Sequence, residues 1–141
     1  SNNIIIINGP NLNLLGEREQ SQYGTVTFDK LKENCLSKAK DLNIDLEFSQ
    51  SNIEGELIGK IQDIGYSYDG IVLNAAAYTH TSIGIGDAVK AISTPVIEVH
   101  ISNTYAREAF RHQSFISPNA KGIILGFGLK SYELALQSFI K

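Results

Sequence analysis

Short runs rich in isoleucine, leucine and valine recur along this chain, and they constrain its fold more than any other feature. They occupy residues 4–7, 44–48, 71–73, 96–101 and 123–125. Near-continuous aliphatic runs are typical of strands that are covered on both faces. Between the runs, apolar residues return at spacings of three and four in three stretches: 28–42, 57–68 and 129–139. That spacing predicts amphipathic helices.

Strands that alternate with helices predict βαβ units and a mostly parallel sheet. The chain has 141 residues, which suits a single domain covering residues 1–141. We therefore expect an α/β fold, a flavodoxin-like doubly wound sheet of five parallel strands with helices on both faces. A plain Rossmann half is the alternative.

Composition excludes several classes of function. The net charge of −3 provides no overall basic field for binding nucleic acid. The single cysteine, Cys35, lies in an apolar helical stripe and is interpreted as a core residue. No Cys/His cluster has the spacing of zinc ligands, so no metal site is expected. No apolar stretch is long enough to span a membrane. We expect a soluble, cytoplasmic protein.

One long segment after the first predicted strand lacks any periodicity. Residues 9–24 contain Asn11, Arg18 and Tyr23 between glycines. Loops of this length in a compact domain are usually functional or disordered. We interpret this segment as an active-site lid.

Polar residues gather where the predicted strands end. Asn74 ends the third strand and is followed by His80, while Glu98 and His100 end the fourth and are followed by Ser102. Ligands of open α/β sheets bind beyond the carboxyl ends of the strands. Taken singly, the asparagine and the serine are explained as caps of the helices that follow. Capping explains His100 poorly, and a lone histidine at a strand end is as readily a packed side chain as a functional one.

The chain contains three arginines, Arg18, Arg107 and Arg111. Arginine is well suited to hold a carboxylate, so the set indicates a small anionic substrate. Arg107 and Arg111 are expected on a helix after the fourth strand, and Arg107 alone is assigned to the solvated face of that helix.

Common catalytic and nucleotide-binding motifs are missing. The two GxG fragments lack the rest of a dinucleotide fingerprint, and neither a phosphate-loop lysine motif nor a GxSxG elbow occurs. A tyrosine and an arginine in a lid, facing histidines and amides, suit proton removal beside a carbonyl. A nearby cation such as Arg18 would lower the pKa of the Tyr23 phenol. The rival interpretation is a flavodoxin-like binding module without chemistry, for instance one for flavin mononucleotide.

Several motifs follow one another in a specific order. They are Asn8-Gly9-Pro10-Asn11-Leu12-Asn13-Leu14-Leu15-Gly16, Arg18-Glu19, Tyr23-Gly24, Ala77-Tyr78-Thr79-His80-Thr81-Ser82, Glu98-Val99-His100-Ile101-Ser102-Asn103 and Phe110-Arg111. Together they resemble the type II 3-dehydroquinate dehydratases over essentially the whole chain. The resemblance implies reversible dehydration of 3-dehydroquinate to 3-dehydroshikimate, the third step of the shikimate pathway, without metal, cofactor or imine.

The resemblance also implies catalytic roles for individual residues. Tyr23 would remove the proton next to the ketone, and Arg18 would lower the pKa of its phenol. A water held near Asn11 would stabilise the enolate. His100 would protonate the departing hydroxyl, and Glu98 would orient its ring.

Substrate binding and assembly are implied in the same way. Asn74, His80 and Arg111 would hold substrate hydroxyls. The backbone N–H groups of Ile101 and Ser102 would bind the carboxylate.

Asp87 would reach the site of a neighbouring subunit in a homododecamer, a tetramer of trimers. Gly84 and Gly86 precede it, and each is expected to weaken that helix by about 0.5–1 kcal/mol relative to alanine.

Overall fold

Five parallel strands form the sheet that the aliphatic runs predict. The computed structural model describes residues 2–15 and 27–141 of the chain. Within that part, the strands are β1 (Asn2–Asn8), β2 (Ile44–Gln50), β3 (Gly70–Asn74), β4 (Val96–His100) and β5 (Gly122–Leu125). Each predicted run lies in a strand, although Ile101 falls just beyond the end of β4.

The strand order reverses once across the sheet. The order is β2-β1-β3-β4-β5, and every pairing is parallel. This doubly wound, flavodoxin-like order confirms the expected fold class over the Rossmann half. The reversal falls between β1 and β3, whose last residues Asn8 and Asn74 are register partners. In such sheets a crevice opens at this point, beyond the carboxyl ends of the strands.

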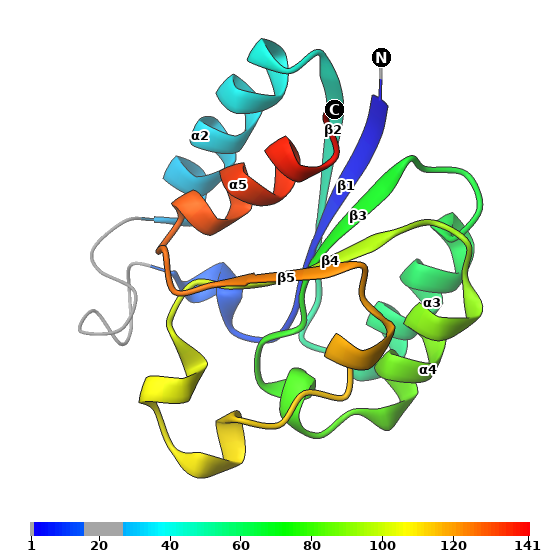
Figure 1. Ribbon diagram of the computed structural model, residues 1–141, viewed down its shortest axis with the longest axis vertical. Helices are drawn as coiled ribbons and strands as arrows, with labels where there is room; N and C mark the ends of the chain where they lie inside the picture. Colours follow the sequence, from blue (N-terminus) through cyan, green and yellow to red (C-terminus); the bar gives the residue numbers. More distant parts are fainter. Residues whose placement is uncertain (1, 16–26) are drawn as a thin grey trace.

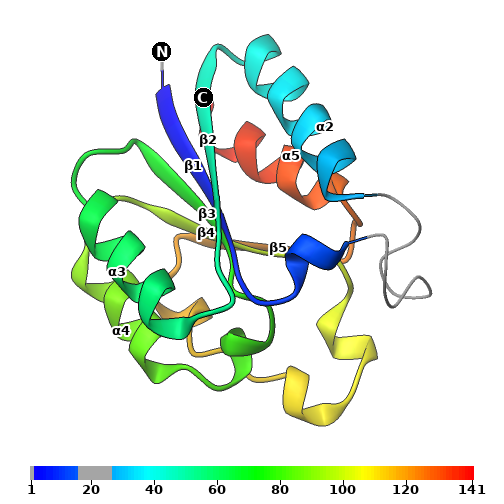
Figure 2. The ribbon, with the colours of Figure 1, turned by 180° about the vertical axis from the view of Figure 1, so that it is seen from behind.

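Helices cover both faces of the sheet (Figures 1 and 2). On one face lie α2 (Phe28–Asp41) and α5 (Lys130–Ser138), and on the other lie α3 (Glu54–Ile64) and α4 (Ile83–Ala91). In the described residues, no helix has both the length and the apolar character needed to cross a membrane.

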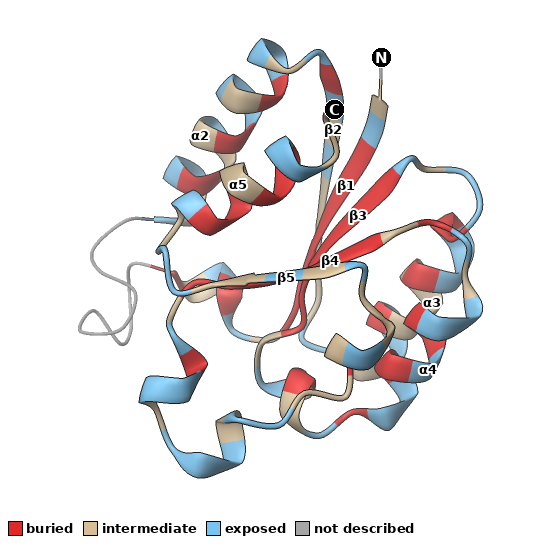
Figure 3. Cartoon of the chain, viewed as in Figure 1, coloured by how far each residue is buried: buried red, intermediate tan, exposed pale blue. Residues whose placement is uncertain are grey.

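The predicted apolar stripes face the sheet. Leu31, Cys35 and Ala39 of α2 pack into one core cluster, and Leu57 and Ile61 of α3 pack into the other. Burial, followed by the charge of Glu133, raises the pKa of the Cys35 thiol to about 12, consistent with a core residue. Strands β3 and β4 are buried throughout and β1 is buried from Ile4 to Asn8, whereas the edge strands β2 and β5 are only partly covered (Figure 3).

The helix expected after the fourth strand is absent from this part of the structure. The segment instead forms two short 3₁₀ turns, η3 (Thr104–Ala106) and η4 (Ala109–Arg111), separated by the extended residues Arg107 and Glu108. Tyr105 and Phe110 are 62% and 65% exposed. The segment therefore has no apolar stripe against the sheet, and such packing supplies most of the stability of helices in proteins.

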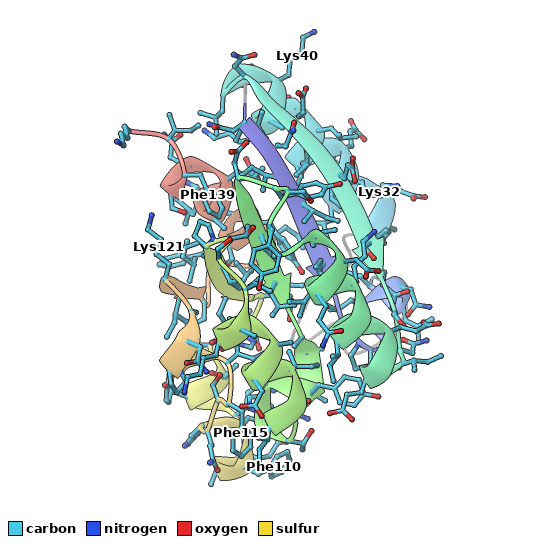
Figure 4. All side chains as sticks on the ribbon, turned by 90° about the vertical axis from the view of Figure 1, so that its right-hand side faces the viewer. Lys32, Lys40, Phe110, Phe115, Lys121 and Phe139 are labelled. Atoms are coloured by element: carbon cyan, nitrogen blue, oxygen red, sulfur yellow. The ribbon has the colours of Figure 1, made fainter. Side chains whose placement is uncertain are left out.

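Gly86 lies where α4 approaches another segment of the chain. A Cβ atom at this position would overlap the carbonyl oxygen of Phe115, whose side chain lies next to α4 (Figure 4). Asn119 also donates a hydrogen bond to the Gly86 carbonyl, at 3.2 Å. The sequence alone predicts that Gly86 weakens its helix. The structure shows that glycine at this position permits a close backbone contact, which matters more for stability than helix propensity. At Gly84 the atom nearest to an added Cβ would be the flexible end of the Ile58 side chain.

We expect Gly86→Ala to lower the free energy of unfolding by about 1–3 kcal/mol, because the added methyl group overpacks the α4 contact. Gly59→Ala is the matched control, since Gly59 lies in α3 with open space around its Cβ position. That change should raise stability by about 0.5–1 kcal/mol through helix propensity alone. Urea unfolding midpoints of both variants would measure this, and equal stabilisation by both changes would contradict the account.

Candidate active site

A cavity of about 150 Å³ opens at the carboxyl edge of the sheet, beside the reversal of strand order. Three segments line it, those that follow β1, β3 and β4. The lining residues are Pro10, Asn11, Leu12, Leu15, Asn74, Ala76, Ala77, His80, His100, Ile101, Ser102, Thr104, Arg107 and Arg111. Seven of the predicted site residues therefore share one cavity: Asn11, Asn74, His80, His100, Ile101, Ser102 and Arg111.

His100 and Glu98 form a buried pair on one face of β4. Side chains two residues apart in a strand point to the same face. The Nε2 atom of His100 lies 2.6 Å from the Oε2 atom of Glu98, and the two residues are 6% and 1% exposed. An ionised carboxylate only accepts hydrogen bonds, so Nε2 donates. The other ring nitrogen, Nδ1, takes no part in this bond and can contact a different group.

Two serines complete the surroundings of the Glu98 carboxylate. Ser117 donates a hydrogen bond to Oε1 at 2.5 Å, and the Ser114 hydroxyl lies 3.1–3.2 Å from both oxygens. Burial alone would raise the pKa of Glu98, but the hydrogen bonds from His100, Ser117 and Ser114 outweigh it and hold the pKa below its ordinary value. Glu98 therefore stabilises the fold above pH 4.5, and this contribution is lost as the pH falls through the lowered folded-state pKa.

His80 is the second imidazole of the cavity, at the end of the 3₁₀ turn η2 (Ala76–His80). Its Nδ1 atom lies 2.7 Å from the carbonyl oxygen of Gln113 and donates to it. The ring stacks on His100 at a centroid distance of 6.2 Å. Burial lowers the pKa of His80, the charges of His100 and Arg111 act in the same direction, and the Gln113 bond only partly opposes them. A neutral His80 leaves Nε2 as an acceptor for a hydroxyl group.

Asn74 is held by a chain of buried hydrogen bonds. Its Nδ2 atom donates to the hydroxyl of Tyr132 at 2.9 Å, and that hydroxyl donates to Oδ1 of Asn8 at 2.7 Å. The Oδ1 atom of Asn74 accepts from the backbone N–H of Ala76 at 3.1 Å. These bonds fix the orientation of the amide and leave its second N–H as a donor.

Both described arginines line the cavity. Arg111 donates from Nε to Glu108 at 2.9 Å, and this bond lowers the pKa of the exposed Glu108 carboxyl. Arg107 was assigned from sequence to a solvated helix face, and this is wrong. Its side chain is 10% exposed and lines the cavity, because the extended backbone at Arg107 and Glu108 replaces the expected helix.

The remaining predicted residues occupy different positions. Asn11 lies at the cavity mouth with φ 70°, and its backbone N–H donates to Oδ1 of Asn52 at 2.9 Å. The N–H groups of Ile101 and Ser102 donate no hydrogen bond to a described residue. Asp87 is exposed on α4 and is not among the lining residues.

Arg18, Tyr23 and most of the segment interpreted as a lid lie outside the described residues, which resume at residue 27.

Sequence reasoning missed Ser114, Ser117 and Tyr132. The serines lie in an irregular segment without periodicity, and Tyr132 occupies an apolar helical stripe that predicts only core packing. The composition around these residues carries no signal for their contacts with Glu98 and Asn74.

Known proteins resemble this chain along nearly its whole length. A sequence model of the family described as "Dehydroquinase class II" matches residues 2–140. A "3-dehydroquinate dehydratase" of Acaryochloris marina is 53% identical over 137 residues, which are 97% of this chain and 92% of that protein. The "3-dehydroquinate dehydratase 1" of Agrobacterium fabrum is 52% identical over 138 residues, 98% of this chain and 95% of that protein.

The architecture agrees with these sequence matches. The crystal structure of a type II dehydroquinase from Butyrivibrio crossotus superposes with a TM-score of 0.94 at 46% identity, covering 97% of this chain and 96% of that one. The chain therefore belongs to the class II dehydroquinase family.

Proposed function

We propose that this chain is a cytoplasmic lyase that dehydrates 3-dehydroquinate to 3-dehydroshikimate reversibly, by anti elimination through an enolate. The observation that carries the proposal is the His100–Glu98 pair at the edge of a cavity lined by amides and arginines. An imidazole held by a carboxylate suits a proton donor to a leaving hydroxyl. The proposed mechanism calls on no metal or cofactor.

The proton transfers are assigned to Tyr23 and His100, and stabilisation of the enolate to Arg18 and a water near Asn11. Tyr23 removes the proton next to the ketone, and Arg18 lowers the pKa of that phenol and stabilises the developing enolate. A water near Asn11 adds a hydrogen bond to the enolate oxygen. The enolate then collapses, the carbon–oxygen bond breaks, and His100 gives its proton to the departing hydroxyl to form water.

Binding of the substrate is assigned to the cavity walls. Asn74, His80 and Arg111 hold hydroxyl groups of the ring. The N–H groups of Ile101 and Ser102 bind the carboxylate, supported by the lack of other partners among the described residues. Because η3 spans only three residues, this anion site depends on the individual N–H groups rather than on a helix dipole.

Asp87 is assigned to the site of a neighbouring copy in a homododecamer. Its exposure on α4, away from the cavity of its own chain, is consistent with that role. The substrate is a small molecule, and neither nucleic acid nor membrane is a partner in this proposal.

Tyr23→Phe should abolish turnover while substrate binding persists, because the phenolic oxygen is the proposed base. The assay follows absorbance of the conjugated enone product, and binding is measured by calorimetry. Tyr66→Phe is the control, since Tyr66 is 72% exposed and does not line the cavity. Near-normal turnover by Tyr23→Phe would show that another group removes the proton.

His100→Ala should lower kcat by about 10²–10⁴-fold, the usual contribution of a general acid. His112→Ala is the control, because His112 does not line the 150 Å³ cavity. That variant should keep most of the wild-type activity. If both variants lost activity equally, His100 would not be the specific proton donor.

Two inactive variants should complement each other if Asp87 serves a neighbouring site. A mixture of Asp87→Ala and His100→Ala subunits, refolded together, contains sites that combine an intact His100 with an intact Asp87 of the neighbour. Random mixing in equal amounts restores about a quarter of the sites. Recovery of enone formation would be measured after mixing, and no recovery from a properly assembled mixture would contradict shared sites.

A further inference from the structure

The segment between η4 and β5, which includes the 3₁₀ turn η5 (Ser117–Asn119), supplies both hydroxyl groups that touch Glu98. Ser117 donates to Oε1 at 2.5 Å, and Ser114 reaches both carboxylate oxygens. The Ser114 oxygen itself accepts the N–H groups of Ile116 and Ser117 at 3.1 and 3.0 Å. With its acceptor sites occupied in this way, the single proton of Ser114 is left to point at Glu98.

Glu98 consequently has donors on every side that the structure describes. His100 and Ser114 face Oε2, and Ser117 and Ser114 face Oε1. A protonated carboxyl would have to donate a hydrogen bond itself, so Ser117 or His100 would have to change from donor to acceptor. The surroundings therefore favour the ionised form.

Ionisation of Glu98 determines where the proton of the pair resides. If the carboxyl were the more basic partner, the shared proton would move from the imidazole to Glu98. His100 would then be neutral and unable to protonate a leaving group. A buried carboxylate also needs donors that remain after His100 has given up its proton, since an uncompensated charge in the interior is costly.

We propose that Ser114 and Ser117 are positioning residues that keep Glu98 ionised and turned toward His100, so that the imidazole carries the proton used in the reaction. This inference rests on the proposed function, in which His100 is the proton donor. Neither serine lines the 150 Å³ cavity, so both act through Glu98 rather than on the substrate.

The segment that carries Ser114 and Ser117 is attached to η2 on one side and to α4 on the other. The Phe115 N–H donates to the carbonyl of Thr79 at 2.9 Å, and the Gln113 carbonyl accepts from His80 at 2.7 Å. On the other side, the segment contacts α4 at Gly86. Ile116 is fully buried in the core cluster on the α3 and α4 face. These contacts hold the two hydroxyls in place without help from the substrate.

The other titratable and charged groups near Glu98 lie around one small cavity of about 20 Å³. They are His100 on β4, His80 on η2, Tyr105 on η3, Arg111 on η4 and His112 directly after η4. The neighbouring strands β3 and β5 place Leu73 and Ile123 opposite Glu98 in the sheet. Among the described residues, the serines are thus the neutral donors to Glu98, and their removal leaves these charges unchanged.

Ser117→Ala should lower kcat about tenfold or more, the effect of losing a hydrogen bond to a charged group, while KM stays unchanged. Ser117→Thr retains the hydroxyl and should keep most of kcat. Ser138→Ala is the matched control, because its hydroxyl bonds only within α5, to the Ala135 carbonyl. On the Glu98→Gln background, Ser117→Ala should have little further effect, since the charge through which it acts is gone.

Stability provides a readout that does not need the reaction. The loss in free energy of unfolding caused by Ser117→Ala should be present at pH 7 and shrink below about pH 4.5, as Glu98 becomes protonated. If the wild-type protein were inactive on 3-dehydroquinate, the proposed function would be wrong. The stability measurement would still test whether Ser117 stabilises the ionised form of Glu98. An active wild type whose kcat is unchanged by Ser117→Ala, or falls equally in the Glu98→Gln background, would overturn the inference.

Discussion

A negative charge buried in a parallel sheet is the interaction on which the rest of this site depends. Glu98 is 1% exposed, and an isolated ion in such a position costs several kcal/mol. Three donors compensate the charge, one from its own strand and two from the segment before β5. The position of His100 and the course of that segment both follow from this requirement, as does the close contact at Gly86 that holds the segment against α4.

Stability alone does not explain why a charge occupies this position. A buried ion pair can often be replaced by apolar residues of similar volume without loss of stability. The neighbouring imidazoles suggest a chemical reason. Burial, together with the charges of His100 and Arg111, lowers the pKa of His80, so His80 stays neutral beside its stacked partner. The buried carboxylate thus holds one of two stacked imidazoles at the cavity, and the other, neutral His80, presents Nε2 as a hydrogen-bond acceptor.

The sequence predicts the strands and the edge that carries the site because both depend on local pattern. Aliphatic runs mark the strands, and the residues that follow them must meet at one edge of a parallel sheet. Arg107, Ser114 and Ser117 could not be placed in this way. Their positions depend on the extended backbone at Arg107 and Glu108 and on contacts with Thr79 and Gly86, which are distant in sequence. Likewise, Gly86 appears from propensity to be a weakness, and only the approach of Phe115 shows its use.

The amide of Asn74 illustrates how topology sets chemistry at one atom. Asn8 and Asn74 end adjacent strands and are register partners, so a single phenol, that of Tyr132 on α5, can bond to both. Since the Ala76 N–H occupies Oδ1 of Asn74 and Tyr132 accepts from Nδ2, rotating the amide by 180° would place a donor against a donor. The orientation that remains leaves an N–H group for an acceptor. The pairing that joins β1 to β3 therefore also determines that Asn74 presents an N–H donor at the cavity.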